Sequence, residues 1–270
     1  MTRVAGVIGW PAAHSLSPAI HNAAFGAAGL DWVYGTFEVA PGRAIAALDA
    51  LRTLGLGGLS VTTPHKEDVV GALDELTPVA QTLGAVNTVV VDGDRLVGHN
   101  TDGDGFVAAL AAAAVDVAGT SVAVLGAGAA ARGLIEALGR AGAATIAVVN
   151  RSAERAAHAA DLAVAAHVGL PDDVRGAALV VNATSVGMGT TEVPLDVSLL
   201  CPDQVVADVV YHPLDTALLI AARRAGCRTV DGLAMLVHQA VLQHELWTGR
   251  RPDPALLRAA ADAELTRRAR

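Results

Sequence analysis

Short apolar segments alternate with longer amphipathic ones along the first hundred residues of the chain. Apolar or alternating runs predict strands, and runs with a helical period predict the helices between them. We expect strands at 4–8, 32–39, 57–61, 86–91 and 95–98, and helices at 18–28, 43–53, 66–73 and 78–83. Asp92-Gly93-Asp94 predicts a hairpin turn between the last two strands. This order favours a mostly parallel sheet, to which the hairpin adds an antiparallel edge.

A second alternating unit begins at Val122, after a helix expected at 104–115, and ends near Val230. We expect its strands at 122–125, 145–150, 179–182, 205–209 and 228–230. The helices after Gly232 do not follow this rhythm, and we expect them to return to the first domain. The sequence therefore predicts an α/β protein with a cleft between two domains. Residues 1–101 with 232–270 form an α/β domain with a mostly parallel sheet, and residues 102–231 form a Rossmann-like, doubly wound domain.

Composition and charge exclude several classes of protein. The net charge of −8 and the pI near 5.5 argue against a nucleic-acid partner, which requires a clustered basic surface. The longest apolar run, 107–115, is roughly half of the ~20 residues that a membrane-spanning helix needs. Cys201 and Cys227 lack the spacing of a metal or redox motif, so we expect reduced thiols and no metal site. We therefore expect a cytoplasmic protein without a membrane partner, either a monomer or a homodimer.

A glycine pattern directly follows the first apolar run of the second domain. Gly126-Ala127-Gly128-Ala129-Ala130-Ala131 matches G-x-G-x-x-A, and a helix is expected to open at Arg132. In dinucleotide-binding proteins the first glycine allows a tight turn and the second lets the main chain approach the pyrophosphate, which lies at the helix N-terminus. The pattern alone is weak in an alanine-rich chain. The strand before it and the helix after it favour a dinucleotide site.

The end of the next strand indicates which dinucleotide binds. NAD-binding proteins carry a carboxylate there, about 20 residues after the glycines, that holds the ribose hydroxyls. In this chain the strand ends in Asn150-Arg151-Ser152, with Arg155 one turn later and no acid at the tip. Guanidinium groups suit a 2′-phosphate by charge and by geometry, and the alternative is a solvated helix start with Ser152 as its N-cap. We predict NADP as the cofactor.

Two loops carry an ionisable group at the junction of a strand and a helix. Thr63-Pro64 predicts an N-cap and a first helical residue, which puts Lys66 in a first turn where the helix dipole disfavours a cation. Asp102 opens a later helix, as an N-cap or as a functional group. A lysine and an aspartate at strand ends can move a proton off an alcohol. With a dinucleotide site downstream, they indicate a dehydrogenase that acts on a hydroxyl group.

Three further polar groups are candidates for substrate binding. Ser15-Leu16-Ser17-Pro18 offers two hydroxyl groups at the start of the first helix. Ser17 and Pro18 suit an N-cap and a first helical residue, or else the two hydroxyls form a corner that binds a carboxylate. Asn87 and Gln239 each offer one amide to a ligand, and a surface position is the alternative for Gln239.

Taken in order, these segments resemble the shikimate dehydrogenase family, from about Gly6 to Gln239. The matching motifs are Ser15-Leu16-Ser17-Pro18, Val61-Thr62-Thr63-Pro64-His65-Lys66, Gly84-Ala85-Val86-Asn87-Thr88, Asn100-Thr101-Asp102-Gly103, Gly126 to Arg132, Asn150-Arg151, Asn182-Ala183-Thr184-Ser185, Asp208-Val209-Val210-Tyr211, and Gly232 through Gln239. The resemblance implies an oxidoreductase that uses NADP to interconvert 3-dehydroshikimate and shikimate, in the pathway to chorismate and the aromatic amino acids. Its first domain would then bind the substrate and its second would bind NADP.

The resemblance also implies a role for each matching residue. Lys66 and Asp102 are the expected catalytic pair, and the division of proton transfer between them stays open. The expected substrate-binding residues are Ser15, Ser17 and Tyr211 at the carboxylate, and Thr62, Lys66, Asn87, Asp102 and Gln239 at the ring hydroxyls. The expected cofactor-binding residues are Gly126, Ala127, Gly128, Ala129, Ala130, Asn150, Arg151, Arg155, Thr184, Val209, Gly232 and Met235.

Three residues depart from the commonest form of the family. Trp10 puts a large ring near the serine pair, Ala129 replaces a frequent glycine, and His65 adds a titratable neighbour to Lys66. Trp10 leaves the exact substrate open, since relatives also accept quinate or amino-shikimate analogues. The alternatives are therefore a quinate/shikimate or amino-shikimate-type dehydrogenase. A non-catalytic NADP-binding sensor is a further alternative, against which the retained Lys66 and Asp102 argue.

Overall fold

The computed structural model describes residues 2–268, which form two compact units. Unit 1 contains the described residues up to Thr101 and those from Val237 onward, and unit 2 contains Asp102–Leu236. The first boundary lies between Thr101 and Asp102. The second falls inside one helix, α9 (Gly232–Thr248), five residues after the expected position.

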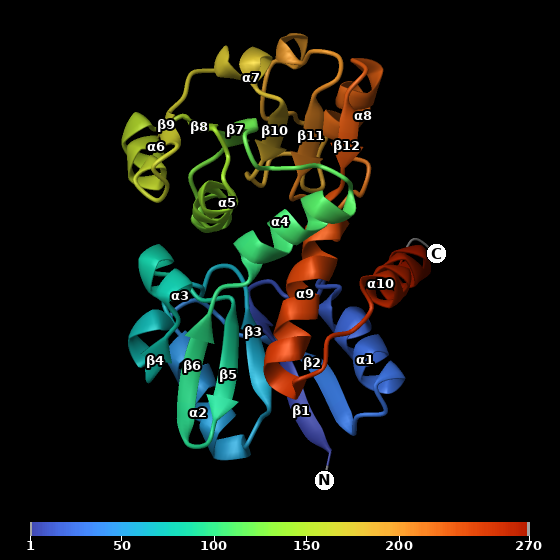
Figure 1. The fold of residues 1–270 in the computed structure, drawn as a ribbon. Coiled ribbons are helices and arrows are strands. Elements are labelled where there is room, and N and C mark those ends of the chain that lie inside the picture. Colours follow the sequence, from blue (N-terminus) through green and yellow to red (C-terminus); the bar gives the residue numbers. More distant parts are fainter. Residues whose placement is uncertain (1, 269–270) are drawn as a thin grey trace. The chain divides into compact units, whose positions relative to one another are not determined.

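Unit 1 is built on a six-stranded sheet with the order β2-β1-β3-β5-β6-β4 (Figure 1). Its strands are β1 (Arg3–Gly9), β2 (Trp32–Glu38), β3 (Gly58–Val61), β4 (Glu75–Leu76), β5 (Thr88–Asp92) and β6 (Arg95–His99). β1 pairs in parallel with β2 and β3, whereas β5 runs antiparallel to both β3 and β6. The expected hairpin is present, but the two-residue β4 lies outside it and forms the edge, parallel to β6. No sequence pattern marks so short a strand.

The helices of unit 1 follow the predicted order with one exception. They are α1 (Ser17–Ala27), α2 (Ala44–Leu54), α3 (Pro78–Leu83), the later part of α9, and α10 (Pro254–Arg268). The helix expected at 66–73 is wrong: residues 63–69 form turns, and only the 3₁₀ helix η1 (Val70–Ala72) follows. A helix does not form at 66–73 because this segment bonds to a distant part of the chain: the Lys66 carbonyl accepts a hydrogen bond from Val86 N, 2.8 Å away. The helix-dipole argument for Lys66 therefore does not apply.

The sheet of unit 1 buries a different kind of surface on each face. Leu59 and Val61 of β3 belong to an aliphatic cluster that contains Leu48 and Leu51 of α2. Successive strand residues point to opposite faces, so the neighbouring Gly58 and Ser60 point away from that cluster and toward α9. A side chain at Gly58 would collide with the indole of Trp247. A second cluster, which we call the aromatic cluster, contains Phe25, Tyr34 and Trp247, with the rings of His21 and His244 packed against them.

Unit 2 is a parallel six-stranded sheet with the order β12-β11-β10-β7-β8-β9 (Figure 1). Its strands are β7 (Ser121–Leu125), β8 (Thr145–Val149), β9 (Ala166–Val168), β10 (Leu179–Asn182), β11 (Val205–Asp208) and β12 (Arg228–Val230). Its helices are α4 (Asp102–Ala112), α5 (Ala129–Arg140), α6 (Ala153–Ala160), α7 (Asp173–Gly176) and α8 (Ala217–Arg224), with the 3₁₀ helix η2 (Val197–Leu199). Strand order reverses between β7 and β10, as in a doubly wound dinucleotide-binding fold, and ligands of such sheets lie at this switch point.

Two adjacent helices of unit 2 cross at very close range. A side chain at Gly103 of α4 would collide with the carbonyl oxygen of Gly133 in α5. The glycine of the Asn100-Thr101-Asp102-Gly103 segment is thus required for helix packing. Among residues 2–268, no helix is both long and apolar enough to cross a membrane.

Candidate active site

Main-chain hydrogen bonds gather three of the predicted residues at the carboxyl end of β3. Thr62 follows that strand, and its N–H donates to Ile8 O at 2.9 Å. Val61 N donates to Asn87 O at 2.7 Å, and the Lys66 carbonyl accepts from the residue before Asn87. Because β5 is antiparallel to β3, the start of β5 meets the end of β3. The main chain at Thr62, Lys66 and Asn87 is therefore held at one edge of the unit 1 sheet, with the Lys66 side chain half-buried.

The side-chain amide of Asn87 is fixed in one orientation. It is 2% exposed, and its Oδ1 accepts hydrogen bonds from Thr101 N at 2.9 Å and from Thr88 Oγ1 at 2.7 Å. Its Nδ2 donates to Thr101 Oγ1 at 3.0 Å. Both lone pairs of the amide oxygen are occupied, so Asn87 can offer a ligand only an N–H donor.

The serine pair does not cap α1 in the expected way. Ser17 is the first helical residue, Leu16 is the N-cap position, and no side chain caps the helix there. Ser17 is buried, and its hydroxyl hydrogen-bonds with the phenol of Tyr34. Ser15 lies in the preceding turn, and its Oγ accepts the Ser17 N–H at 3.2 Å. The N-cap prediction for Ser17 is wrong because Tyr34 occupies the hydroxyl.

Helix α10 holds the main chain of the loop that contains His14 and Ser15, which we call the serine loop. The Arg268 guanidinium donates to His14 O at 2.6 Å and to Ser15 O at 2.9 Å. Glu264 binds both Arg267 and Arg268, which lowers the pKa of its carboxyl to about 2. The serine loop is thus tied to two helices of its own unit.

Two more predicted residues are buried, one in each unit. Gln239 of α9 is 7% exposed, so the alternative of a surface position is wrong. Asp102 is 6% exposed and is the first residue of α4 in unit 2. Lys66 belongs to unit 1, so the pairing of Lys66 with Asp102 stays a prediction.

The glycine loop after β7 has the properties of a phosphate-binding loop. Gly126 has φ +109°, and a side chain there would meet the Thr184 methyl group at 2.9 Å. Gly128 is the N-cap of α5, where no side chain caps the helix, and no atom lies within 4 Å of where its Cβ would be. The helix begins at Ala129, three residues before the expected Arg132, because Gly128 already provides the cap position. The loop thus offers helix N–H groups next to open space.

The end of β8 is cationic. Arg151 and Arg155 are both exposed, and neither guanidinium forms an ion pair with another of the described residues. Asn150 Nδ2 donates to Ser152 O at 2.9 Å, and Ser152 Oγ accepts Arg155 N at 3.3 Å as the cap of α6. Ser152 is therefore the N-cap, but the cap does not engage the guanidinium groups. The two cations and the open N-terminus of α5 fit a dinucleotide that carries a 2′-phosphate.

A buried polar cluster supports the loops after β10 and β11. The Asp208 carboxylate accepts from Asn182 Nδ2 at 2.9 Å and Thr216 Oγ1 at 2.8 Å, and burial raises its pKa. Asn182 in turn accepts from Thr184 Oγ1 at 2.6 Å. Sequence reasoning missed this role of Asp208, although an acid that ends an apolar strand is a usable signal.

The remaining cofactor candidates lie along these loops and the start of α9. Val209 N donates to Asn182 O at 3.0 Å. A side chain at Gly232 would meet the carbonyl oxygens of Val209 and Val210 at 2.5 Å. Met235 is half-buried against the core of unit 2, and Tyr211 is half-buried in the loop after β11. Gly232 is therefore required by packing against the main chain after β11.

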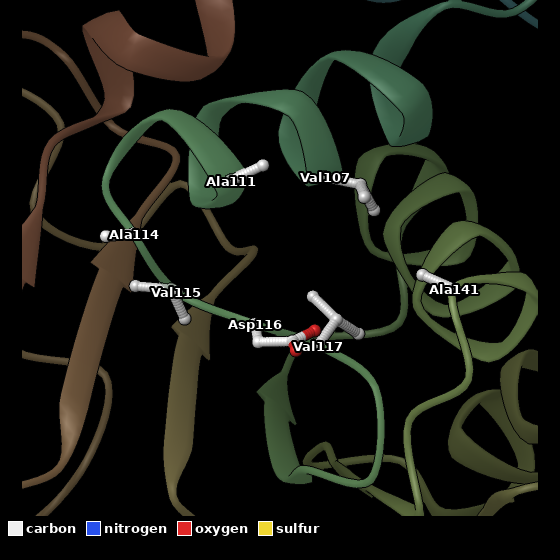
Figure 2. Close-up of a pocket in the computed structure, with 7 residues that line it drawn as sticks. All are labelled: Val107, Ala111, Ala114, Val115, Asp116, Val117 and Ala141. Atoms are coloured by element: carbon white, nitrogen blue, oxygen red, sulfur yellow. The ribbon is translucent and has the colours of Figure 1, made fainter.

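One hollow in unit 2 lies away from these loops. It has a volume of about 510 Å³ and is lined by Val107, Ala111, Ala114, Val115, Asp116, Val117 and Ala141 (Figure 2). These residues come from α4, from the segment that precedes β7, and from the end of α5, so the hollow lies at the opposite end of β7 from Gly126. Its carboxylate, Asp116, accepts Ala118 N at 3.0 Å and repels phosphate, so the hollow does not suit a dinucleotide. Within residues 2–268, no group of three or more His, Cys, Asp or Glu side chains is arranged to hold a metal ion.

Family models match most of the chain. The shikimate dehydrogenase substrate binding domain matches residues 7–89, shikimate / quinate 5-dehydrogenase matches 109–185, and the shikimate 5′-dehydrogenase C-terminal domain matches 232–261. The chain belongs to the shikimate dehydrogenase family. It is 49% identical to the shikimate dehydrogenase (NADP(+)) of Symbiobacterium thermophilum, over 97% of this chain and 95% of that protein.

Solved structures of shikimate dehydrogenases and their relatives share the fold. The shikimate 5-dehydrogenase of Thermus thermophilus, in complex with NADP(H) and shikimate, superposes with a TM-score of 0.93 at 37% identity and covers 97% of this chain and 99% of its own. A quinate dehydrogenase from Corynebacterium glutamicum, in complex with NAD, superposes with a TM-score of 0.90 at 37% identity, over 97% and 99% of the two chains. The α/β fold with two mostly parallel sheets is thus that of shikimate dehydrogenases.

Proposed function

We propose that this protein catalyses the NADP-dependent, reversible reduction of 3-dehydroshikimate to shikimate, in the synthesis of chorismate and the aromatic amino acids. Family membership supports the reaction class. One structural observation supports the proposal: main-chain hydrogen bonds hold the loop that carries Lys66 next to the segment that carries the buried amide of Asn87, at the end of β3. A lysine that handles a proton and an amide that binds a hydroxyl are what reduction of a polyhydroxylated ketone requires.

Each step of the reaction draws on groups of this chain. NADPH, when bound, supplies a hydride to the ring ketone. Lys66 donates a proton to the ketone oxygen, or stabilises the negative charge that develops on it. Asp102 orients a ring hydroxyl and holds Lys66 by charge. Asn87 donates its N–H to a ring hydroxyl oxygen, because its own oxygen is occupied.

The other candidates hold the ends of the substrate and the cofactor. Ser15, Ser17 and Tyr211 bind the carboxylate, and Thr62 and Gln239 bind ring hydroxyls. The loop from Gly126 to Ala130 receives the pyrophosphate at the N-terminus of α5, and the residues at the end of β8 receive the 2′-phosphate. The residues that line the rest of the cofactor are Thr184, Val209, Gly232 and Met235.

A second candidate function is a quinate/shikimate dehydrogenase. The quinate dehydrogenase among the structural neighbours favours it, together with Trp10, whose ring is 48% exposed at the end of β1. The two exposed guanidinium groups at the end of β8 favour NADP over NAD, and so favour the shikimate reaction. Retained proton-handling residues argue against a non-catalytic NADP-binding sensor.

Initial rates measured at the absorbance of the reduced nicotinamide separate these functions. Shikimate and quinate are each offered with NADP and with NAD. We expect fast turnover with shikimate and NADP alone. Turnover with quinate or NAD would favour the second candidate, and NADP binding without turnover would favour the sensor. A cytoplasmic location and a monomeric or homodimeric state are further proposals, the second of which light scattering tests directly.

A further inference from the structure

The side-chain amide of Gln243 uses all of its hydrogen-bonding capacity inside unit 1. Gln243 lies on α9 and is 2% exposed. Its Oε1 accepts from Ser60 Oγ at 2.8 Å and from His21 Nε2 at 3.3 Å. Its Nε2 donates to Thr88 Oγ1 at 2.8 Å and to Asn87 O at 3.3 Å. One amide therefore joins α9 to α1, β3 and β5.

On the β5 side, Gln243 determines the direction of the hydrogen bonds that reach Asn87. The Thr88 hydroxyl accepts from Gln243 Nε2, so its own proton is directed to Asn87 Oδ1, 2.7 Å away. Thr101 N–H occupies the second lone pair of that oxygen. A flipped Asn87 amide would place its NH₂ group against the Thr101 N–H, donor against donor. Gln243 and Thr101 together thus keep the Asn87 oxygen turned inward.

On the β3 side, the same amide orients the Ser60 and Tyr34 hydroxyl groups, which lead to Ser17. Ser60 donates to Gln243 Oε1, so Ser60 Oγ accepts the Tyr34 hydroxyl proton at 2.6 Å. Tyr34 also hydrogen-bonds with the Ser17 hydroxyl. Burial raises the pKa of Tyr34 and lowers the pKa of His21 to about 3, so both rings stay neutral across the physiological range. The donor and the acceptor of each of these hydrogen bonds therefore stay the same across the physiological pH range.

We propose that Gln243 is a positioning residue for substrate recognition. It sets Asn87 as a hydrogen-bond donor and steadies Ser17, through Thr88 on one side and Ser60 with Tyr34 on the other. The inference rests on the proposed function, in which Asn87 holds a ring hydroxyl of shikimate and Ser17 its carboxylate. In this role Gln243 does not contact the substrate; it links α9 to the sheet by hydrogen bonds and so fixes the residues that do.

Two substitutions at Gln243 test the inference. Gln243→Met keeps the length of the side chain and removes both the donor and the acceptor. We expect it to raise the KM for shikimate about tenfold at every pH, since a buried hydrogen-bonded amide is lost. Gln243→Glu keeps the shape, and a protonated carboxyl still donates to Thr88 and accepts from Ser60, whereas a carboxylate only accepts. We therefore expect its KM to be near that of the wild type at low pH and to rise as the carboxyl ionises.

Trp247→Phe is the matched control. Trp247 lies one turn further along α9 and donates its Nε1–H to Val89 O at 3.0 Å. This hydrogen bond is also buried between α9 and the sheet, but it is not connected to the side chain of Asn87. Trp247→Phe should keep the KM for shikimate within about twofold of the wild-type value. All three variants should keep the wild-type KM for NADP, which reports the integrity of unit 2.

Several results would overturn the inference. Examples are a KM for shikimate in Gln243→Met that stays at the wild-type value, or one that changes no more than in Trp247→Phe. Should Gln243→Met fail to fold, the pH profile of Gln243→Glu decides: a flat profile overturns the inference, and a KM that rises with pH supports it. Absence of shikimate turnover by the wild type is a separate outcome, which overturns the proposed function itself.

Discussion

Lys66 is the only lysine in the 270-residue sequence, so its chemistry can be addressed without interference from other ε-amines. Its carbonyl is bonded to Val86 N, which fixes the main chain from which the half-buried side chain extends. A group held in this way can deliver a proton repeatedly to one substrate atom without reorganisation of the loop.

Removal of the Lys66 amine should affect turnover and spare cofactor binding. We expect Lys66→Ala to lower kcat by about 10²–10⁴, as is typical when a general acid–base group is removed. The KM for NADP should change little, because Lys66 lies in unit 1 and the glycine loop lies in unit 2. Steady-state kinetics measures both constants, and an unchanged kcat would remove Lys66 from the mechanism. Amine-directed modification, with shikimate as protectant, provides a second readout on the unmutated enzyme.

Arg151 should distinguish NADP from NAD. We expect Arg151→Ala to raise the KM for NADP by about tenfold or more, because a guanidinium–phosphate contact is lost, and to leave the KM for NAD nearly unchanged. Arg175→Ala is the matched control, since Arg175 is an exposed arginine on α7 of the same unit. Equal losses with the two cofactors would contradict the 2′-phosphate assignment.

Individual site residues could be predicted when a local pattern marked them, but their supports could not. The glycine loop and Arg151 stand out by their position after strands, whereas Ser60 and Gln243 have no motif. Their importance arises from partners that are distant in sequence: Ser60 Oγ and Gln243 Oε1 are 183 positions apart. Ser17 shows the converse error, because its helix-start context predicted a cap that Tyr34 prevents.

At the level of elements, hydrophobic periodicity predicted the long strands and helices and failed for segments whose structure is imposed by neighbours. β9 is three residues long and its residues are half-buried or exposed, so no apolar run marks it. Residues 66–73 have a helical pattern, yet the hydrogen bond from Val86 N to the Lys66 carbonyl favours turns. In both places the pairing partner lies outside the segment, where a local pattern carries no information.

The last residues of α10 offer a test of how a segment beyond the matched family regions supports the site. The C-terminal domain model ends at residue 261, and Arg268 lies beyond it. We expect Arg268→Ala to raise the KM for shikimate about threefold to tenfold, because two hydrogen bonds to the serine loop are lost from an exposed side chain. The KM for NADP should not change.

Arg267→Ala is the matched control for that substitution. Arg267 binds the same Glu264 carboxylate and is more exposed, at 72% against 33% for the Arg268 side chain. It makes no bond to the loop among the contacts of the described residues. Kinetics in which the two variants behave alike would assign the effect to the Glu264 ion pair and not to the loop.

On the scale of the whole molecule, the aromatic cluster makes stability depend on pH. Burial lowers the pKa of His21 to about 3 and that of His244 to about 4, from 6.5 in the unfolded chain. Between pH 6.5 and about 4, the unfolded chain therefore binds protons that the folded chain does not. The free energy of unfolding should fall with acidification, by up to about 1.4 kcal/mol per pH unit for each histidine. Urea unfolding at several pH values measures this slope.

His244→Phe should both raise stability and reduce that slope. Neither ring nitrogen of His244 has a hydrogen-bond partner within residues 2–268, and the ring packs at a tilt against Phe25, at a centroid distance of 4.9 Å. A phenyl ring removes a buried, unsatisfied polar group, which stabilises by about 1–2 kcal/mol near neutral pH. Loss of stability in this variant would indicate that the imidazole has a partner of its own.

The division of the chain was predictable only in part, because a helix carries no mark where one unit ends and the next begins. The change of rhythm after Gly232 predicted a return to the first domain. The structure assigns the first turn of α9 to unit 2 and the rest to unit 1. Gly232 packs on the main chain after β11, and Trp247 packs over Gly58 of β3, so tertiary contacts of single residues set the boundary.

The aromatic residues of unit 1 make the two halves of the enzyme spectroscopically distinct. All three tryptophans of the sequence, Trp10, Trp32 and Trp247, belong to unit 1. Indole fluorescence therefore follows only the half that carries the serine loop, with Trp10 48% exposed and Trp247 7% exposed as red-shifted and blue-shifted emitters. Unfolding of unit 2 alone would not change the tryptophan fluorescence directly, but it would be visible in far-ultraviolet circular dichroism. A difference between the two unfolding curves would thus measure whether the halves melt together.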